Sequence, residues 1–226
     1  MPNWASTNFR FFGNREELER LKAFFKKWNR VESIVNDFHE GWLGNLLCGC
    51  LIDTGEATPE TIQDVYQNMD LPYHRGSVVW TEDLGDELDV ETETAWNAMP
   101  QVFDFIISRL GLEEISYVYM EEELGCCIYQ TNDTDGIVWG PEFDYYVNID
   151  LDGADRKPLL GRMETTIQDT MDEDGFVNLA CDILQLPVPE TITEEFAVSL
   201  VDQMNSNEWK DDNTFVSIQK LERISS

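Results

Sequence analysis

Basic residues are scarce in most of this chain. Residues 41–155 hold two, Arg75 and Arg109, against 25 Asp and Glu, whereas the first 40 residues balance seven Lys and Arg against six acids. The 226 residues together carry 15 Lys and Arg, 45 Asp and Glu, and a formal net charge of −30. A chain this negative repels nucleic acid and anionic membranes and attracts basic partners. We therefore expect no direct binding to nucleic acid or membrane.

Targeting signals and long apolar runs are also missing. The opening residues lack the basic and apolar regions of a secretory signal, and no apolar run approaches the ~18–20 residues that span a bilayer. These absences predict a cytoplasmic protein. Hydrophobic residues make up 42% of the chain and aromatic residues 12%. This composition predicts a packed core despite the acidity.

Motifs for metals, cofactors and nucleophilic catalysis are absent. The five cysteines include no Cys-x-x-Cys pair, and the two histidines, His39 and His74, have no Ser/His/Asp or Cys/His context. An odd cysteine count in a non-secreted chain favours reduced thiols. We interpret Cys48-Gly-Cys50 and Cys126-Cys127 as small buried hydrophobes, with zinc or iron–sulfur binding as the alternative. The chain has no phosphate-binding or dinucleotide-binding glycine motif, so we expect no cofactor.

The hydrophobic pattern predicts an α+β fold. Residues 7–12 alternate as a strand, and Asn14 with Glu17 predicts a capping box for the helix that follows. Further along the chain the pattern predicts strands over residues 77–82, 88–96 and 115–121 and a helix opened by Pro100. The order strand, helix, insertion, strand, strand, helix, strand predicts a ferredoxin-like antiparallel sheet with two helices on one face.

This prediction assigns residues 1–140 to a ferredoxin-like domain with an insertion at about 32–75. Within the insertion, the glycine-containing apolar stretch 42–52 predicts a buried irregular segment or short strand, and Thr58-Pro59 predicts the start of a short helix. Residues 141–226 read as an α+β extension packed on the first domain. Its predicted elements are a strand over 143–149, a helix over 176–184, a helix capped by Thr193 and a strand over 214–221.

Several short motifs occur together in the N-terminal part. The chain opens with Met1-Pro2-Asn3-Trp4, directly followed by a strand, Gly13 and a helix that starts with acids. It continues with Arg-Gly-Ser-Val-Val-Trp at 75–80, Glu-Thr-Glu-Thr-Ala-Trp at 91–96 and an acidic glycine-containing stretch at 121–136. Together these motifs resemble the YubB-type family, which is carried by plasmids, phages and other mobile elements.

The resemblance covers about residues 1–136. It implies a ferredoxin-like N-terminal domain and a role as an accessory protein of a mobile element, but no catalytic residues, since none is established for the family. Relatives commonly carry a cysteine after the opening Trp, where this chain has Ala5. Any role of that cysteine is therefore missing here.

The stretch from Thr131 to Glu142 partly matches a calcium-binding loop. Asp133, Asp135, Gly136 and Glu142 occupy pattern positions, but Thr131 stands where the first Asp belongs. Asp-Gly between alternating segments is also a strong hairpin signal. We favour the turn and keep Asp133, Asp135 and Glu142 as alternative metal ligands. Asp150–Asp155 reads as a similar turn.

The strongest functional expectation is an acidic surface. The strand over 88–96 alternates, so that Val90, Thr92, Thr94 and Trp96 are expected to face the helices and the intervening acids the opposite side. Pairing of residues 78–121 as one sheet would bring a second group of acids beside them. The predicted partner-binding face consists of Asp83, Asp86, Glu87, Asp89, Glu91, Glu93, Glu121, Glu122 and Glu123.

Three functions follow from these features. The first is an interaction module whose acidic face binds a basic protein, with mimicry of nucleic acid as one form of it. The second is a soluble acidic domain without a charge-based partner. The third is a carboxylate or divalent-metal hydrolase, which needs differently perturbed carboxyl pKa values in a pocket.

The basic cluster Lys22, Lys26, Lys27 and Arg30 is explained by the dipole of its helix.

Overall fold

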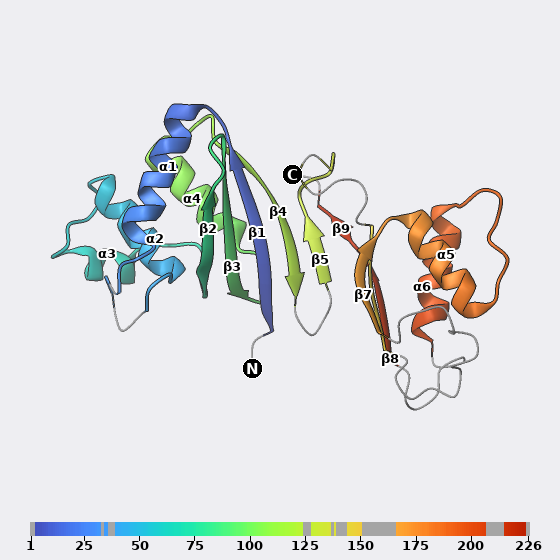
Figure 1. Ribbon diagram of the computed structural model, residues 1–226. Coiled ribbons are helices and arrows are strands. Elements are labelled where there is room, and N and C mark those ends of the chain that lie inside the picture. The colour runs from blue at the N-terminus through green and yellow to red at the C-terminus, as the bar shows by residue number, and fades with distance from the viewer. Residues whose placement is uncertain are drawn as a thin grey trace. The chain divides into compact units, whose positions relative to one another are not determined.

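The chain folds into two compact units, Met1–Cys126 and Cys127–Ser226. Figure 1 shows both in the computed structural model. The sequence placed the corresponding boundary at residue 140, and the packing of the C-terminal region on the first domain stays a prediction. The residues that the structure describes are 3–32, 34–35, 39–123, 128–136, 138, 144–150, 166–206 and 215–224.

The N-terminal unit contains four strands in the order β2-β3-β1-β4, and all neighbours are antiparallel. β1 lies between β3 and β4, and every second residue of it is buried because one face of the sheet packs on the helices. The predicted strands are confirmed, with ends that differ by a few residues. Their bounds are β1 Trp4–Phe12, β2 Gly76–Asp83, β3 Glu87–Ala95 and β4 Ser116–Glu123.

Helices cover one face of these strands (Figure 1). Phe9 and Phe11 of β1 pack against Phe103 of the fourth helix, with ring centroids 4.5 Å and 5.3 Å away. All three rings are almost fully buried. The helices of this unit are α1 Arg15–Trp28, α2 Leu43–Asp53, α3 Ile62–Asn68 and α4 Pro100–Leu110.

The predicted cap of α1 is confirmed in part. Asn14 Oδ1 accepts a hydrogen bond from the Glu17 backbone N–H at 2.9 Å. The Glu17 carboxylate does not complete a capping box; it accepts from the Glu114 backbone N–H at 2.9 Å instead. This contact ties the start of α1 to the turn before β4.

The prediction for residues 42–52 is wrong, because this stretch is the helix α2. Every residue from Leu43 to Leu51 is buried, so no polar face marks a helical period. Its glycines serve close packing. A Cβ on Gly49 would meet Trp28 Cδ2 of α1 at 2.3 Å, and one on Gly44 would meet Trp42 Nε1 at 2.4 Å.

The end of β3 and the start of α3 also differ from the prediction. β3 ends at Ala95, and Trp96 has a φ of 82° and a half-exposed side chain, so it does not face the helices. α3 begins at Ile62, because residues 59–61 form turns in which the Thr61 hydroxyl accepts from the Thr58 N–H at 2.9 Å.

The C-terminal unit has a three-stranded antiparallel sheet in the order β7-β6-β8 and a core of its own. Tyr145 of β6 stacks on Phe176 of α5 with centroids 4.4 Å apart. Thr193 caps α6 through a bond from the Phe196 N–H at 3.3 Å, as expected. β7 was not expected. The elements are β5 Ile128–Thr131, β6 Tyr145–Asp150, β7 Thr166–Met171, α5 Glu173–Leu184, α6 Glu194–Asn205, β8 Phe215–Lys220 and β9 Glu222–Arg223.

The α+β class is confirmed, because the described residues form six helices, a six-stranded sheet and a three-stranded sheet. Within the same residues, each helix is too short or too polar to traverse a bilayer.

Candidate functional site

The register of β3 divides its side chains between two faces. Val90 lies opposite Phe9 and Leu88 opposite Phe11, so these residues point to the helices and are buried. Thr92 and Thr94 follow the same parity and are also fully buried, as expected. The acids between them therefore lie on the face opposite the helices.

Six carboxylates share this opposite side, which we call the outer carboxylate face. Glu82 of β2 lies directly opposite Asp89, and Glu93 and Glu122 both lie opposite Ser6 of β1. Glu82 and Glu93 are exposed, and the others are half-buried. The outer carboxylate face comprises Glu82, Glu87, Asp89, Glu91, Glu93 and Glu122.

Arg10 of β1 lies within this face. Its Nε and Nη2 donate to the two oxygens of Asp89, both at 2.7 Å, and Nε lies 3.3 Å from Glu87. The bond to Asp89 is the main cause that raises the pKa of Arg10 above its ordinary value. Bidentate pairs are stronger and more rigid than ordinary surface pairs. One arginine fixes Asp89 and leaves the face strongly negative.

Glu121 does not belong to the acidic surface. Its side chain is 2% exposed and lies on the helix side, since it pairs with Thr7 and alternates with Met120 and Glu122. Its Oε2 accepts from the Ala98 N–H at 3.0 Å, just before α4. Burial raises the pKa of Tyr119, and the Glu121 carboxylate adds to this effect. Three consecutive acids on one strand cannot share a face.

The three remaining acids of the predicted face, Asp83, Asp86 and Glu123, lie in different surroundings. Asp83 lies opposite Leu88 and forms an ion pair with Lys22 of α1, with Nζ 2.5 Å from Oδ1. This contact is the main cause that lowers the pKa of Asp83. Asp86 is exposed in the turn between β2 and β3. Glu123 pairs through its backbone with Ala5, and its side chain lies outside the described part of the chain.

A β-bulge adds an aromatic side chain to the outer carboxylate face. The register shifts between Val78, opposite Thr92, and Trp80, opposite Glu91. The shift moves Trp80 from the helix side to the acidic side, where 46% of it is exposed. Bulges re-aim side chains in this way and are frequent beside functional sites. A strand pattern alone does not reveal a bulge, so the sequence analysis missed Trp80, together with Arg10 and Glu82.

The loop after β5 is a turn built by Asp133. Its buried carboxylate accepts from the Val138 N–H at 2.9 Å, and its backbone oxygen accepts from Arg223 Nη1 at 2.8 Å. Asp135 is exposed, and Glu142 and residues 151–155 lie outside the described part. The predicted turn is confirmed. No group of three or more His, Cys, Asp or Glu that could hold a metal ion occurs among the described residues.

The described cysteines Cys48, Cys50 and Cys181 are free and buried. Burial raises the pKa of Cys48 to about 12, and burial is also the main cause that raises that of Cys50 to about 12. Neutral thiols at this depth are poor nucleophiles and poor metal ligands. Cys126 and Cys127 lie outside the described residues.

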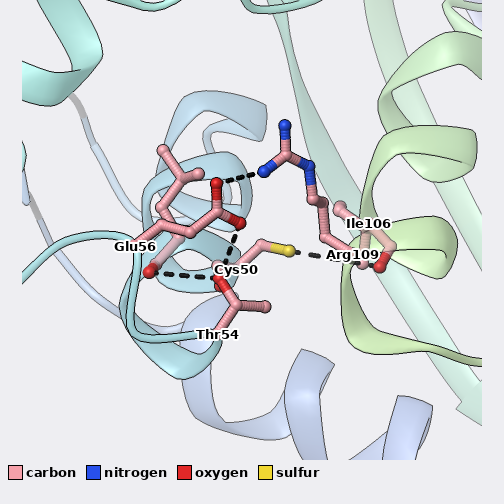
Figure 2. Close-up of polar contacts among 6 residues, drawn as sticks. Cys50, Thr54, Glu56, Ile106 and Arg109 are labelled. Atoms are coloured by element: carbon pink, nitrogen blue, oxygen red, sulfur yellow. Dashed lines mark hydrogen bonds and ion pairs between the residues drawn. The ribbon is translucent and has the colours of Figure 1, made fainter.

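Figure 2 shows the surroundings of Cys50, whose Sγ lies 4.0 Å from the backbone oxygen of Ile106. Beside it, the Arg109 guanidinium donates to the Glu56 carboxylate, and this bond is the main cause that lowers the pKa of Glu56. These contacts join the end of α2 to α4. We interpret the group as structural.

The histidines also have local partners. His74 Nε2 lies 2.6 Å from the Tyr66 hydroxyl, and its Nδ1 lies 2.6 Å from the Pro72 backbone oxygen. Because a carbonyl oxygen only accepts, His74 Nδ1 donates to the Pro72 oxygen. The pair fixes the segment between α3 and β2.

Comparison with known proteins adds no assignment. No protein-family model, no curated protein and no solved structure matches this chain.

Proposed function

We propose that this protein is an acidic interaction module whose outer carboxylate face binds a basic protein. The observation that supports this most is the register of β3, which turns four successive acids to the side away from the helices. Neighbouring like charges reduce stability through repulsion. Glu82 directly opposite Asp89 is such a case, in which Arg10 offsets part of the repulsion. The chain keeps these repelling charges on the same side of the sheet as the exposed Trp80, and such a surface is suited to binding a basic protein.

The charge and the aromatic side chain have different roles in binding. A negative surface raises the rate of encounter with a basic partner and makes the affinity fall with salt. Trp80 supplies contact area that salt does not screen, and tryptophan is enriched among residues that dominate interface energy. Glu91 lies directly opposite Trp80, so both contacts fall on one patch.

In one form of this proposal the partner is a nucleic-acid-binding protein. Side chains on one face of a strand repeat about every 6.8 Å, so the four acids of β3 make a row about 20 Å long. Proteins that bind nucleic acid use Lys and Arg to neutralise a regular row of phosphates. A carboxylate row presents the same sign of charge, so duplex DNA should compete with it for such a partner.

We also propose that the N-terminal unit is ferredoxin-like and that the chain is a mobile-element accessory protein of the YubB type. The antiparallel order β2-β3-β1-β4 supports the first assignment, with α1 and α4 in the two connections and α2 and α3 as an insertion. The assignment to the YubB type rests on the sequence motifs. A YubB-type relative whose strands follow another order would contradict that assignment.

The test is affinity capture from a bacterial lysate with two variants of equal charge. The face variant is Glu82→Gln, Glu91→Gln, Glu93→Gln and Glu122→Gln, which leaves the Arg10–Asp89 pair intact. The control variant removes four exposed acids elsewhere in the N-terminal unit. These control changes are Glu40→Gln, Asp64→Asn, Asp70→Asn and Glu113→Gln.

We expect wild type and control to capture the same basic proteins at low salt and to release them at high salt, while the face variant captures none. Release of the captured protein by duplex DNA would support mimicry. If no basic protein is enriched, or if the face variant captures the same set, the chain is an acidic domain without a charge-based partner.

A further inference from the structure

The N-terminal unit contains a cavity of about 230 Å³ between α1 and the β2–β3 hairpin, away from the outer carboxylate face. One side of it carries Lys22, Lys26 and Arg30. Lys22 and Lys26 lie one turn apart on α1, and Arg30 follows two residues after the helix ends at Trp28, so the three cations form a stripe along the cavity. Phe25 and Leu88 also line the cavity and are buried in the core.

The cations of this stripe differ in what they contact. Lys22 Nζ lies 2.5 Å from Asp83 Oδ1 and 3.4 Å from Glu19 Oε1, so its charge is neutralised within the protein. Lys26 and Arg30 form no ion pair or hydrogen bond with the described residues. Two uncompensated positive charges therefore face the cavity.

The chain has three acids for each base. Six cations of the described residues form ion pairs, among them Lys27 with Asp53 and Arg109 with Glu56, whereas Lys26 and Arg30 form none. The helix dipole favours cations at the C-terminal end of α1. Lys27 at the same end forms an ion pair with Asp53. The dipole explains why Lys26 and Arg30 are basic and leaves open why they lie beside a cavity.

We propose that this cavity binds a small, multiply charged anion of the phosphate-ester class. Lys26 and Arg30 supply the charge, and Arg presents several donors that match phosphate oxygens. Asn29 and Thr81 line the same cavity and offer neutral polar groups. Asp83 does not oppose the anion, because Lys22 and the Gly85 N–H already bind its Oδ1.

The net charge of the chain does not prevent such binding. Exposed charges farther away than about 10 Å are largely screened at 0.1 M salt, so the groups at the cavity dominate. The cavity volume restricts the ligand to a compact anion and excludes duplex nucleic acid, whose phosphates lie on a broad surface. The proposal is independent of the outer carboxylate face.

The test is calorimetric titration of the full chain with inorganic pyrophosphate. The site variant is Lys26→Gln with Arg30→Gln, and the control is Arg15→Gln with Arg75→Gln. All four residues are exposed, and each variant removes two cations. We expect saturable binding to wild type and control, and an affinity lower by about tenfold or more in the site variant because two charge-assisted contacts are lost. Absence of saturable binding to wild type would overturn the proposal, as would equal losses in both variants.

Discussion

The substitution Gly49→Ala should destabilise the protein, although alanine is the better helix former. Ala gains about 1 kcal/mol over Gly inside a helix. Against this, the new Cβ would lie 2.3 Å from Trp28 Cδ2 and 2.5 Å from Cγ, which requires the ring to move. Trp28 is 9% exposed and its Nε1 donates to Asp53 Oδ2 at 2.8 Å, so moving the ring disturbs a well-packed contact. Core overpacking costs about 1–3 kcal/mol.

Three indole atoms would lie within 3.0 Å of the new Cβ, so we place the overpacking cost in the upper part of its range, at about 2–3 kcal/mol, and expect a net loss of about 1–2 kcal/mol. Urea unfolding of the single variants and of the double variant with Trp28→Leu measures the coupling. Without the indole, Gly49→Ala should be neutral or stabilising. A stabilising Gly49→Ala in the native background, or a cost that persists without Trp28, would refute the packing of α2 against α1.

Three further predictions follow from the same structure. Glu121→Ala should cost about 1–3 kcal/mol because the Ala98 N–H loses its acceptor, and Glu121→Gln should cost less; equal urea midpoints for Glu121→Ala and wild type would contradict the buried role of this carboxylate. The pKa values of Cys48 and Cys50, about 12, lie above those of an unfolded thiol, so the stability that they contribute should be lost as the pH rises from about 9 towards 12; peptide mapping should find both unlabelled by iodoacetamide in the native protein at pH 8 and labelled after unfolding, and native labelling would count against their burial. The face variant should melt at a higher temperature than wild type at low salt, with a smaller difference at high salt, since salt screens the repulsion it relieves; a lower melting temperature would show that these acids are stabilising.

The sequence patterns identified the N-terminal sheet chiefly because β1 and β3 alternate strictly. Phe9, Phe11 and Val90 recur with period two, and this period predicts one packed face whatever the neighbouring strands are. The caps at Asn14 and Thr193 were readable for a similar local reason, since each is settled within three residues. The helix α2 was not readable, because a segment buried on all sides has no polar period and its glycines look like breakers.

The predicted side of the sheet is confirmed for Asp89, Glu91 and Glu93 and wrong for Asp83 and Glu121. Asp89, Glu91 and Glu93 alternate with buried residues of their own strand, so their side could be predicted. The side of Glu121 depends on which residue of β1 it pairs with, and that register is not encoded locally. The places of Arg10, Glu82 and Trp80 depend on strand pairing and on a bulge, which are properties of the folded sheet.

Carboxyl footprinting of the captured complex tests the central claim most directly. Each carboxylate is labelled in the free protein and in the complex, and the labelling is compared residue by residue. We predict protection of Glu82, Glu91, Glu93 and Glu122, with unchanged labelling of Glu40, Asp64, Asp70 and Glu113. Protection of the second group without the first would contradict an interaction through the outer carboxylate face.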